Sequence, residues 1–297
     1  MERAQSYIAA GHAVVVDIDL EKFFDRVNHD ILMGLVAKRV ADKRILKLVR
    51  GFLTAGVLEG GLVSPMEEGT PQGGPLSPLL SNLMLNVLDK ELEKRGHCFV
   101  RYADDCNIYV CSRKAGERVM AGIEKFLAKR LKLKVNNAKS AVARPSVRQF
   151  LGFSFTSGKE PRRRIAPQAV ARFKAKVREL TRRTGGKSLA QIVKELSVYL
   201  AGWRGYFGFC QTPSVLRALD QWVRRRLRAV AWKQWKRGRT RFAELRRCGV
   251  GRDLAAQTAG SPHGPWRLAN SPALAVALPT AFLSSLGLAC VAELRPA

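Results

Sequence analysis

Four aspartates occur in two pairs whose spacing allows them to share metal ions. Asp17 and Asp19 stand two residues apart at the end of an apolar, valine-rich run, and residues two apart in a strand point to the same face. Asp104 and Asp105 are adjacent in a polar centre between two apolar stretches, where we expect the tip of a hairpin. Neighbouring carboxylates repel one another, and Mg²⁺, which prefers oxygen ligands, removes that conflict. Two such ions about 4 Å apart activate an attacking hydroxyl and stabilise the leaving oxygen of a phosphate.

The same aspartates also fit a purely structural role. An Asp-Asp pair is common in turns, because its side chains bond to the nearby backbone, and an aspartate at a strand end often caps the helix that follows. Their spacing alone therefore leaves both metal-dependent phosphoryl transfer and plain turn chemistry open.

The first half of the chain has patterns that predict both strands and helices. The apolar run 13–18 predicts a buried strand, and residues 99–110 predict two strands around the Asp-Asp tip. Residues 57–63 predict a hairpin with two central glycines, and alternating apolar residues over 131–135 predict one more strand. Since these strands do not alternate strictly with helices, we expect an α+β domain and not a doubly wound parallel sheet.

Capping residues and apolar spacing predict the helices of this half. Asn28 is expected to cap a first helix. After a loop rich in glycine and proline, Ser77 is expected to cap a long helix with Pro78 at its first position, and Gly96 to end it. Residues 119–131 have the spacing of another amphipathic helix.

Near residue 157 the chain becomes strongly basic. Residues 1–155 carry 24 basic and 17 acidic side chains, whereas residues 156–297 carry 28 and 7, so most of the net charge of +28 lies in the second part. Helical spacing after residue 159, with Ser188 and Thr212-Pro213 at helix starts, predicts an all-α region. A polyanion relieves such self-repulsion, and nucleic acid and anionic membranes are the usual partners.

Nucleic acid is favoured over a membrane. The apolar tail over residues 272–292 approaches spanning length, but Pro279 and Gly287 interrupt it, so we expect a buried core segment. The first residues are mixed and polar, unlike a secretory signal. The six cysteines show no C-x-x-C spacing and no paired histidines nearby, which argues against a zinc site and for a reducing, cytoplasmic setting.

The aspartates belong to a series of five motifs in order along residues 17–155. These are Asp19-Leu20-Glu21-Lys22-Phe23-Phe24-Asp25, Gly69-Thr70-Pro71-Gln72-Gly73-Gly74-Pro75-Leu76-Ser77-Pro78-Leu79-Leu80, Tyr102-Ala103-Asp104-Asp105, Asn136-Asn137-Ala138-Lys139-Ser140 and Phe150-Leu151-Gly152-Phe153. In this order they resemble the palm of reverse transcriptases. The resemblance implies an antiparallel sheet with packed helices and RNA-directed DNA synthesis.

The resemblance also implies a metal site. Asp19 and Asp104 would bind two Mg²⁺ ions, for which Mn²⁺ is an alternative, and Asp105 would bind or orient beside them. Asp17 is the rival for the role of Asp19, and alignment on the Phe-Phe-Asp that follows favours Asp19.

Four further residues would bind the nucleotide by the same resemblance. Phe24 would stack under the sugar and select dNTPs. Gln72 would touch the nucleotide or the template edge through its amide, and Gly73 would let the backbone approach the base pair closely. Lys139 would neutralise or protonate the departing pyrophosphate. Core packing for Phe24, an ordinary loop for Gly73 and a solvated surface charge for Lys139 are the alternatives.

The basic part resembles the thumb, or domain X, of group II intron maturases. The resemblance rests on Gly202-Trp203-Arg204-Gly205-Tyr206-Phe207, the basic stretch 222–235 and Pro265-Trp266-Arg267. It implies RNA binding, for which basic side chains and flat aromatics are suited, by Trp203, Arg204, Arg224, Arg225, Arg228 and Lys233. The arginines at 224, 225 and 228 lie opposite the apolar stripe of their predicted helix, so we expect them to face outward. Each tryptophan has core packing as its alternative.

We therefore expect a palm over residues 1–156, an α-helical RNA-binding thumb over 157–260 and a tail over 261–297 that packs on the thumb. The family's fingers region normally precedes the first metal-binding strand, and only sixteen residues precede Asp17 here. We expect an N-terminally truncated palm: a truncated reading frame, a fragment, or one piece of a split protein whose fingers are supplied in trans.

Two functions are consistent with these patterns. The first is a group II intron RNA-directed DNA polymerase, which extends a DNA primer on an intron RNA template with dNTPs and assists splicing. The second is a catalytically inactive remnant that only binds intron RNA as a maturase. A metal-dependent nuclease is disfavoured, because its motifs would not include the Gly-Thr-Pro-Gln-Gly-Gly loop.

Overall fold

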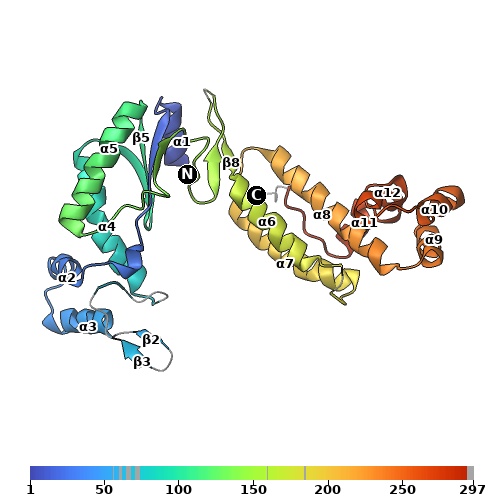
Figure 1. The fold of residues 1–297 in the computed structure, drawn as a ribbon, viewed down its shortest axis with the longest axis horizontal. Coiled ribbons are helices and arrows are strands. Elements are labelled where there is room, and N and C mark those ends of the chain that lie inside the picture. Colours follow the sequence, from blue (N-terminus) through green and yellow to red (C-terminus); the bar gives the residue numbers. More distant parts are fainter. Residues whose placement is uncertain are drawn as a thin grey trace. The chain divides into compact units, whose positions relative to one another are not determined.

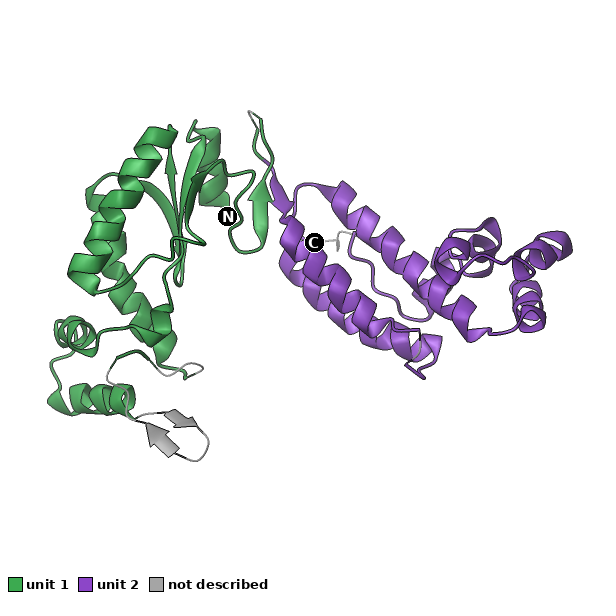
Figure 2. Cartoon of the chain, in the orientation of Figure 1, with its two compact units in different colours: residues 1–161 green, residues 162–297 purple. Residues whose placement is uncertain are grey.

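The chain forms two compact units, Met1–Pro161 and Arg162–Ala297 (Figure 2). The computed structural model describes residues 1–55, 57–59, 62–64, 68–70, 74–158, 160–183 and 185–292. The division falls between two short strands, β7 (Phe153–Phe155) and β8 (Arg163–Ile165).

The first unit is built on a four-stranded antiparallel sheet. Its strands are β1 (Val14–Ile18), β4 (Cys98–Tyr102), β5 (Asp105–Val110) and β6 (Ala141–Ala143), in the order β4-β5-β1-β6. The predicted buried strand at 13–18 and the predicted hairpin at 99–110 are confirmed. Because β5 pairs with both β4 and β1, the tip of the hairpin lies at the same end of the sheet as the end of β1.

Helices cover both faces of this sheet, as Figure 1 shows. The larger core packs one face against α4 (Ser77–Lys94) and α5 (Arg113–Phe126), with Val16 and Ile108 buried among their apolar side chains. The alternate strand positions Val15 and Tyr109 pack on the other face against α1 (Glu2–Ala9). Because the sheet is buried on both faces, β1 is apolar at every position except Asp17 and does not alternate. The α+β prediction is confirmed.

Three shorter elements and a hairpin complete this unit. They are η1 (Phe23–Asp25), α2 (His29–Ala37), α3 (Lys43–Thr54) and the antiparallel pair β2 (Val57–Glu59) and β3 (Leu62–Ser64). The hairpin predicted at 57–63 is confirmed. Asn28 caps α2 as predicted, because its side chain accepts a hydrogen bond from the Ile31 amide at 3.0 Å.

Two local predictions are wrong. Ser77 does not cap α4, because it is already helical and Leu76 is the N-cap. Residues 131–135 form no strand: α5 continues into a π-helical turn, η2 (Leu127–Leu131), and the chain then leaves it through Lys132 in the left-handed region, φ +57°. Only Val135 makes a β-bridge, to Leu20. Leu131 and Leu133 alternate because both enter the core, and a loop can achieve that as well as a strand.

In its described residues, the second unit is helical apart from β8. Three long helices, α6 (Pro167–Leu180), α7 (Leu189–Phe207) and α8 (Pro213–Gln234), precede the shorter α9 (Gly238–Arg247), α10 (Arg252–Ala259), α11 (Pro265–Leu268), α12 (Pro272–Ala277) and α13 (Thr280–Ser285). Ser188 begins α7 with a capping box to Gln191, and α8 starts at Pro213, both as predicted. Strand β8 is the exception to the all-α prediction.

The last residues of the described chain are bonded to α8. Asp220 of α8, a buried carboxylate, accepts hydrogen bonds from the Val291 and Ala292 amides, each at 2.9 Å, and from the Cys290 thiol at 2.8 Å. None of the six cysteines forms a disulfide. Within the described ranges, every helix is too short or too polar to cross a bilayer.

Candidate active site

The four aspartates predicted from spacing come together at one end of the central sheet. Strand β1 ends at Ile18, which pairs with Cys106 of the antiparallel strand β5. Asp19, which follows Ile18, and Asp105, which precedes Cys106, therefore lie at the same end of the sheet. Asp104 lies in the two-residue turn between Tyr102 and Asp105, which pair across β4 and β5. Ala103, the other turn residue, has φ +54°, and a positive φ here is typical of the tight hairpin turns that fit twisted strands.

Burial and the neighbouring carboxylates together raise the pKa of Asp105 to about 7. Burial is the largest cause, followed by the charges of Asp17, Asp104 and Asp19, and Arg148 opposes them. The four carboxylates therefore act on one another electrostatically. Near neutral pH the cluster holds a proton that a metal ion would displace.

Asp17 is engaged by an arginine and is not open for a ligand. Its side chain is only 11% exposed, and its Oδ2 accepts a hydrogen bond from Arg148 Nε at 2.7 Å and lies 2.6 Å from Arg148 Nη2 in the same ion pair. Burial still raises the pKa of Asp17, and the arginine only partly offsets this. Asp19 has a side chain that is 39% exposed, and the cation nearest to it in an ion pair is Lys139 Nζ at 3.9 Å. The geometry therefore favours Asp19 as the carboxylate that faces a ligand.

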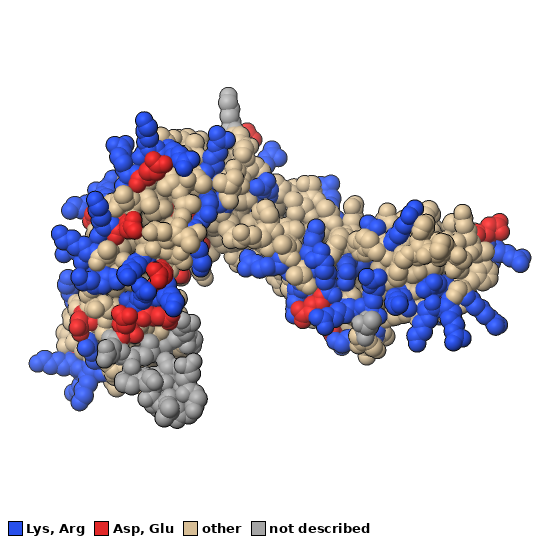
Figure 3. Space-filling model, viewed as in Figure 1, with Lys and Arg blue, Asp and Glu red and all other residues tan. Residues whose placement is uncertain are grey.

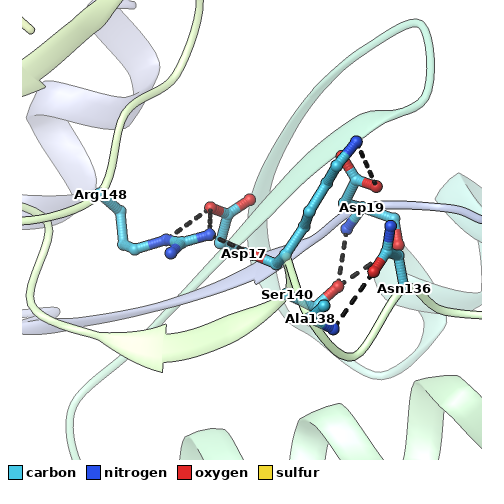
Figure 4. Close-up of polar contacts among 7 residues, drawn as sticks. Asp17, Asp19, Asn136, Ala138, Ser140 and Arg148 are labelled. Carbon is cyan, nitrogen blue, oxygen red and sulfur yellow. Dashed lines mark hydrogen bonds and ion pairs between the residues drawn. The ribbon is translucent and has the colours of Figure 1, made fainter. Parts of the chain in front are cut away.

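The loop after the π-helical turn positions Asp19 (Figure 4). The Asp19 amide donates to Ser140 Oγ at 3.0 Å, and the Asp19 carbonyl accepts from the Asn136 amide at 2.8 Å. Arg148 Nη2 donates to the carbonyl of Lys139, so the arginine that binds Asp17 also holds this loop. Lys139 is thereby placed beside Asp19, with its side chain 68% exposed.

A second arginine fixes the hairpin tip, and sequence reasoning assigned it no role. Arg101 of β4 donates to both carboxylate oxygens of Asp89 in α4, at 2.7 Å and 2.6 Å, and to the carbonyl of Ala103 at 2.7 Å. Asp89 raises the pKa of Arg101 still further, so the pair stays ionised. An arginine in the middle of an otherwise apolar strand was the available signal, because a buried guanidinium requires a partner.

The predicted nucleotide-binding residues divide between the described and undescribed parts. Phe24 is half-buried, with its ring 5.3 Å from that of Phe23 and packed against the main core. Beside it, the Thr70 amide donates to the Phe24 carbonyl at 2.6 Å, which ties the start of the glycine-rich loop to η1. Gln72 and Gly73 lie outside the described residues.

The donor set suits a hard cation. Within the described ranges, no three His, Cys, Asp or Glu side chains are gathered closely enough to enclose a metal ion. Asp19, Asp104 and Asp105 nevertheless supply only oxygen ligands, which Mg²⁺ and Mn²⁺ accept. Burial and then the neighbouring negative charges raise the pKa of Asp105, and a bound cation would offset both effects.

In the second unit, several predicted RNA-binding residues are occupied by internal contacts. Trp203 is 9% exposed and stacks on Phe207 with ring centroids 4.6 Å apart. The expectation that the arginines of α8 face outward is wrong for two of them. Arg225 lies over the Trp266 ring at 4.1 Å and donates to its carbonyl, and Arg228 donates to the Leu278 carbonyl at 3.1 Å. The cause is the later helices, which cover this side of α8.

The other predicted residues of this group remain partly open. Arg204 is half-buried and donates to the Cys290 carbonyl at 3.3 Å. Arg224 lines a hollow of about 460 Å³ with Arg225, Arg228 and Asn270. Lys233 is exposed near the end of α8.

Lys233 belongs to a larger basic pocket of about 700 Å³, which we call the α6–α7 pocket. Its lining comprises Arg182, Arg183, Gly185, Gly186, Lys187, Ser188, Lys233, Gln234, Lys236 and Arg241. Six of these carry a positive charge and none carries a negative one. Figure 3 shows the same imbalance on the visible face of the second unit, where Lys and Arg side chains far outnumber acidic ones.

Comparison with known proteins gives two family matches. Residues 3–155 match the family described as reverse transcriptase (RNA-dependent DNA polymerase), and residues 170–249 match the group II intron, maturase-specific domain.

Similar proteins include intron-encoded ones. Protein YkfC of Escherichia coli is 44% identical over 27% of this chain and 21% of its own length. The group II intron-encoded protein LtrA of Lactococcus lactis is 43% identical over 25% of this chain and 12% of its own. Among solved structures, apo telomerase from Candida tropicalis aligns with 97% of this chain and 57% of its own, at 13% identity and a TM-score of 0.47. The matched part of each curated relative is thus a small share of it.

Proposed function

Because the chain belongs to the reverse transcriptase family, in the branch that group II introns encode, we propose that it is an RNA-directed DNA polymerase that copies intron RNA and assists its splicing. The observation that carries the proposal is the four-aspartate end of the sheet, where burial and three like charges raise the pKa of Asp105 to about 7. A partly buried cluster of carboxylates with a perturbed pKa is typical of a catalytic site.

Each residue at this site has a distinct task in the proposal. Asp19, Asp104 and Asp105 would bind two Mg²⁺ ions, or Mn²⁺ in their place. When bound, the ions supply an activated primer 3′-hydroxyl and a stabilised pyrophosphate leaving group. Asp17 takes no metal in this scheme, because Arg148 binds it through a hydrogen bond and an ion pair.

Lys139 would serve the triphosphate. Its ammonium is held 3.9 Å from Asp19 by the loop that bonds to the Asp19 backbone, and most of its side chain is exposed. A flexible cation beside metal-binding carboxylates is suited to neutralise or protonate the departing pyrophosphate. Phe24 would contact the dNTP sugar from η1, and Gln72 and Gly73 would approach the base pair.

The α6–α7 pocket supports the RNA-binding half of the proposal. Six cations around one hollow, with no acidic side chain in its lining, suit a folded phosphate backbone better than they suit a protein partner. Trp203 and Arg228 would act by shaping this unit and not by touching RNA, since both are engaged internally.

Primer extension tests the polymerase proposal. The chain is given poly(rA)·oligo(dT), dTTP and Mg²⁺, beside an Asp104→Asn variant and a Glu124→Gln control from the exposed face of α5. Extension by the unmodified chain and the control, but not by Asp104→Asn, is expected. Extension that survives Asp104→Asn contradicts the assignment.

An RNA-binding maturase without polymerase activity is the second candidate, and the basic pocket favours it independently of the aspartates. It predicts salt-sensitive binding of structured intron RNA that Asp104→Asn leaves unchanged and that Lys233→Glu with Lys236→Glu weakens. Failure of extension together with such binding would select this candidate.

A further inference from the structure

A groove on the first unit is separate from the aspartate cluster and from every predicted site residue. It has a volume of about 750 Å³ and lies between α2, α4 and the end of α5 with its π-helical turn. Its lining is Asp30, Ile31, Gly34, Leu35, Lys38, Arg39, Leu83, Asn86, Val87, Lys90, Glu91, Lys94, Phe126, Arg130 and Leu131. Apolar and charged side chains are both present, so a partner that fills the groove needs both apolar and charged groups.

The apolar side chains follow two helices. Ile31 and Leu35 are four residues apart on α2, and Leu83 and Val87 are four residues apart on α4. All four are half-buried: each packs against the main core and still lines the groove. Side chains four apart lie on one helix face, so the two pairs form two apolar rows. Two such rows suit a third helix packed between them.

The charged side chains of the rim that have no ion-pair partner within the described ranges are all cationic. Both acidic members are neutralised by arginines outside the groove lining: Asp30 by Arg50 at 2.7 Å and Glu91 by Arg95 at 2.6 Å. The cationic members are exposed, and within the described ranges they form no ion pair: Lys38, Arg39, Lys90, Lys94 and Arg130. Five unneutralised cations around an apolar floor attract an acidic ligand with an apolar face.

We propose that this groove docks an acidic amphipathic helix of a partner protein. The apolar rows would bury the leucine-like face of that helix, and the lysines and arginines of the rim would pair with its carboxylates. Charge complementarity selects this occupant over a second copy of the chain, which carries a net charge of +28. The apolar floor favours a helix over RNA, because phosphates form no favourable contact with the apolar side chains of Leu35 and Val87.

Binding of a defined peptide tests the proposal on the full chain. The probe is a fluorescein-labelled helical peptide with leucines at i, i+3, i+4 and i+7 and glutamates elsewhere, and the comparison peptide has the same composition in scrambled order. Fluorescence anisotropy is expected to show saturable binding of the first and at least about tenfold weaker binding of the second.

Two groove variants and one control localise the binding. Lys90→Glu with Lys94→Glu reverses two exposed rim charges and leaves the core untouched, and Val87→Asp places a charge on the floor. Both are expected to weaken peptide binding at least about tenfold. Arg118→Glu with Lys125→Glu reverses two exposed charges on α5 outside the groove and is expected to change binding little.

Three results would overturn the proposal. They are no saturable binding of the amphipathic peptide, equal binding of the scrambled peptide, and equal loss in the groove and control variants. Saturable binding of a labelled RNA hairpin that Lys90→Glu with Lys94→Glu weakens at least about tenfold, together with no saturable binding of the peptide, would assign the groove to RNA instead. Circular dichroism of each variant verifies that the fold is kept, and the rim variant gives the decisive result if Val87→Asp unfolds.

Discussion

Replacing Asp105 by asparagine is expected to stabilise the metal-free protein, and only above a defined pH. The folded chain holds the pKa of Asp105 at about 7, against an ordinary value of 3.8. Below about pH 4 the carboxyl is protonated in both the folded and the unfolded chain, so it contributes no pH dependence. As the pH rises from about 4 to about 7, the unfolded chain loses the proton first, and the free energy of unfolding falls. Above pH 7 the destabilisation is complete.

The magnitude follows from the size of the pKa shift. One pKa unit corresponds to about 1.4 kcal/mol, so the shift of about three units sets an upper limit near 4 kcal/mol. Because the Asp105 side chain is only partly buried, solvent screening reduces this to about 2 kcal/mol. For a unit of this size, such a change moves the melting temperature by roughly 4–8 °C. Asparagine is uncharged at every pH, so the gain in the free energy of unfolding of the variant over the unmodified chain should develop between pH 4 and pH 7 and then stay constant.

Differential scanning calorimetry in EDTA at pH 4, 5.5, 7 and 8.5 measures this directly. All five tryptophans lie in the second unit, so calorimetry and not tryptophan fluorescence is needed to follow the first. Glu124→Gln on α5 is the matched control and should show no pH-dependent advantage. An Asp105→Asn advantage that is equal at pH 4 and pH 8.5, or that grows toward low pH, would refute the proposed destabilisation by the ionised Asp105.

Three further changes test the surrounding structure. Gly69→Ala should lower the free energy of unfolding by about 2 kcal/mol in urea titrations, because Gly69 has φ +96° and an added Cβ would lie 2.9 Å from the Phe24 carbonyl oxygen; unchanged stability would contradict this. Asp220→Asn should cost the second unit about 2 kcal/mol by removing charge-assisted hydrogen bonds to residues 290–292, seen as an earlier tryptophan-fluorescence transition. Arg101→Lys should slow primer extension roughly tenfold to hundredfold without weakening RNA binding, because it loses the two-pronged bond to Asp89 and frees the hairpin tip; equal losses in both assays would indicate general unfolding.

The sequence was most informative where local pattern and position coincide. The strand at 14–18 and the hairpin around Asp104 were predictable, because short apolar runs bounded by polar residues rarely form anything but buried strands. The Ser188 capping box was predictable for the same local reason. The segment 131–135 was not, since alternating apolar residues bury equally well from a loop.

Contacts between residues far apart in the sequence could not be predicted from local patterns. Nothing in the spacing indicates that Arg148 binds Asp17 across 131 positions, or that Arg101 holds the hairpin tip through Asp89. Arg225 fits an outward position on α8 by periodicity, and only the later helix that brings Trp266 onto it reverses that expectation. In each case a side chain's environment depends on a distant segment, which a pattern along one helix cannot contain.

Single-nucleotide incorporation by two paired variants tests whether Asp19, and not Asp17, is the metal-binding carboxylate of β1's end. The chain, Asp19→Asn and Asp17→Asn are each given a primed RNA template, one dNTP and Mg²⁺. Asp19→Asn is expected to abolish incorporation, because Asp19 is the more exposed carboxylate. Asp17→Asn is expected to keep a measurable part of it, because Asp17 binds Arg148 and not metal. Incorporation that survives Asp19→Asn and disappears with Asp17→Asn would contradict it.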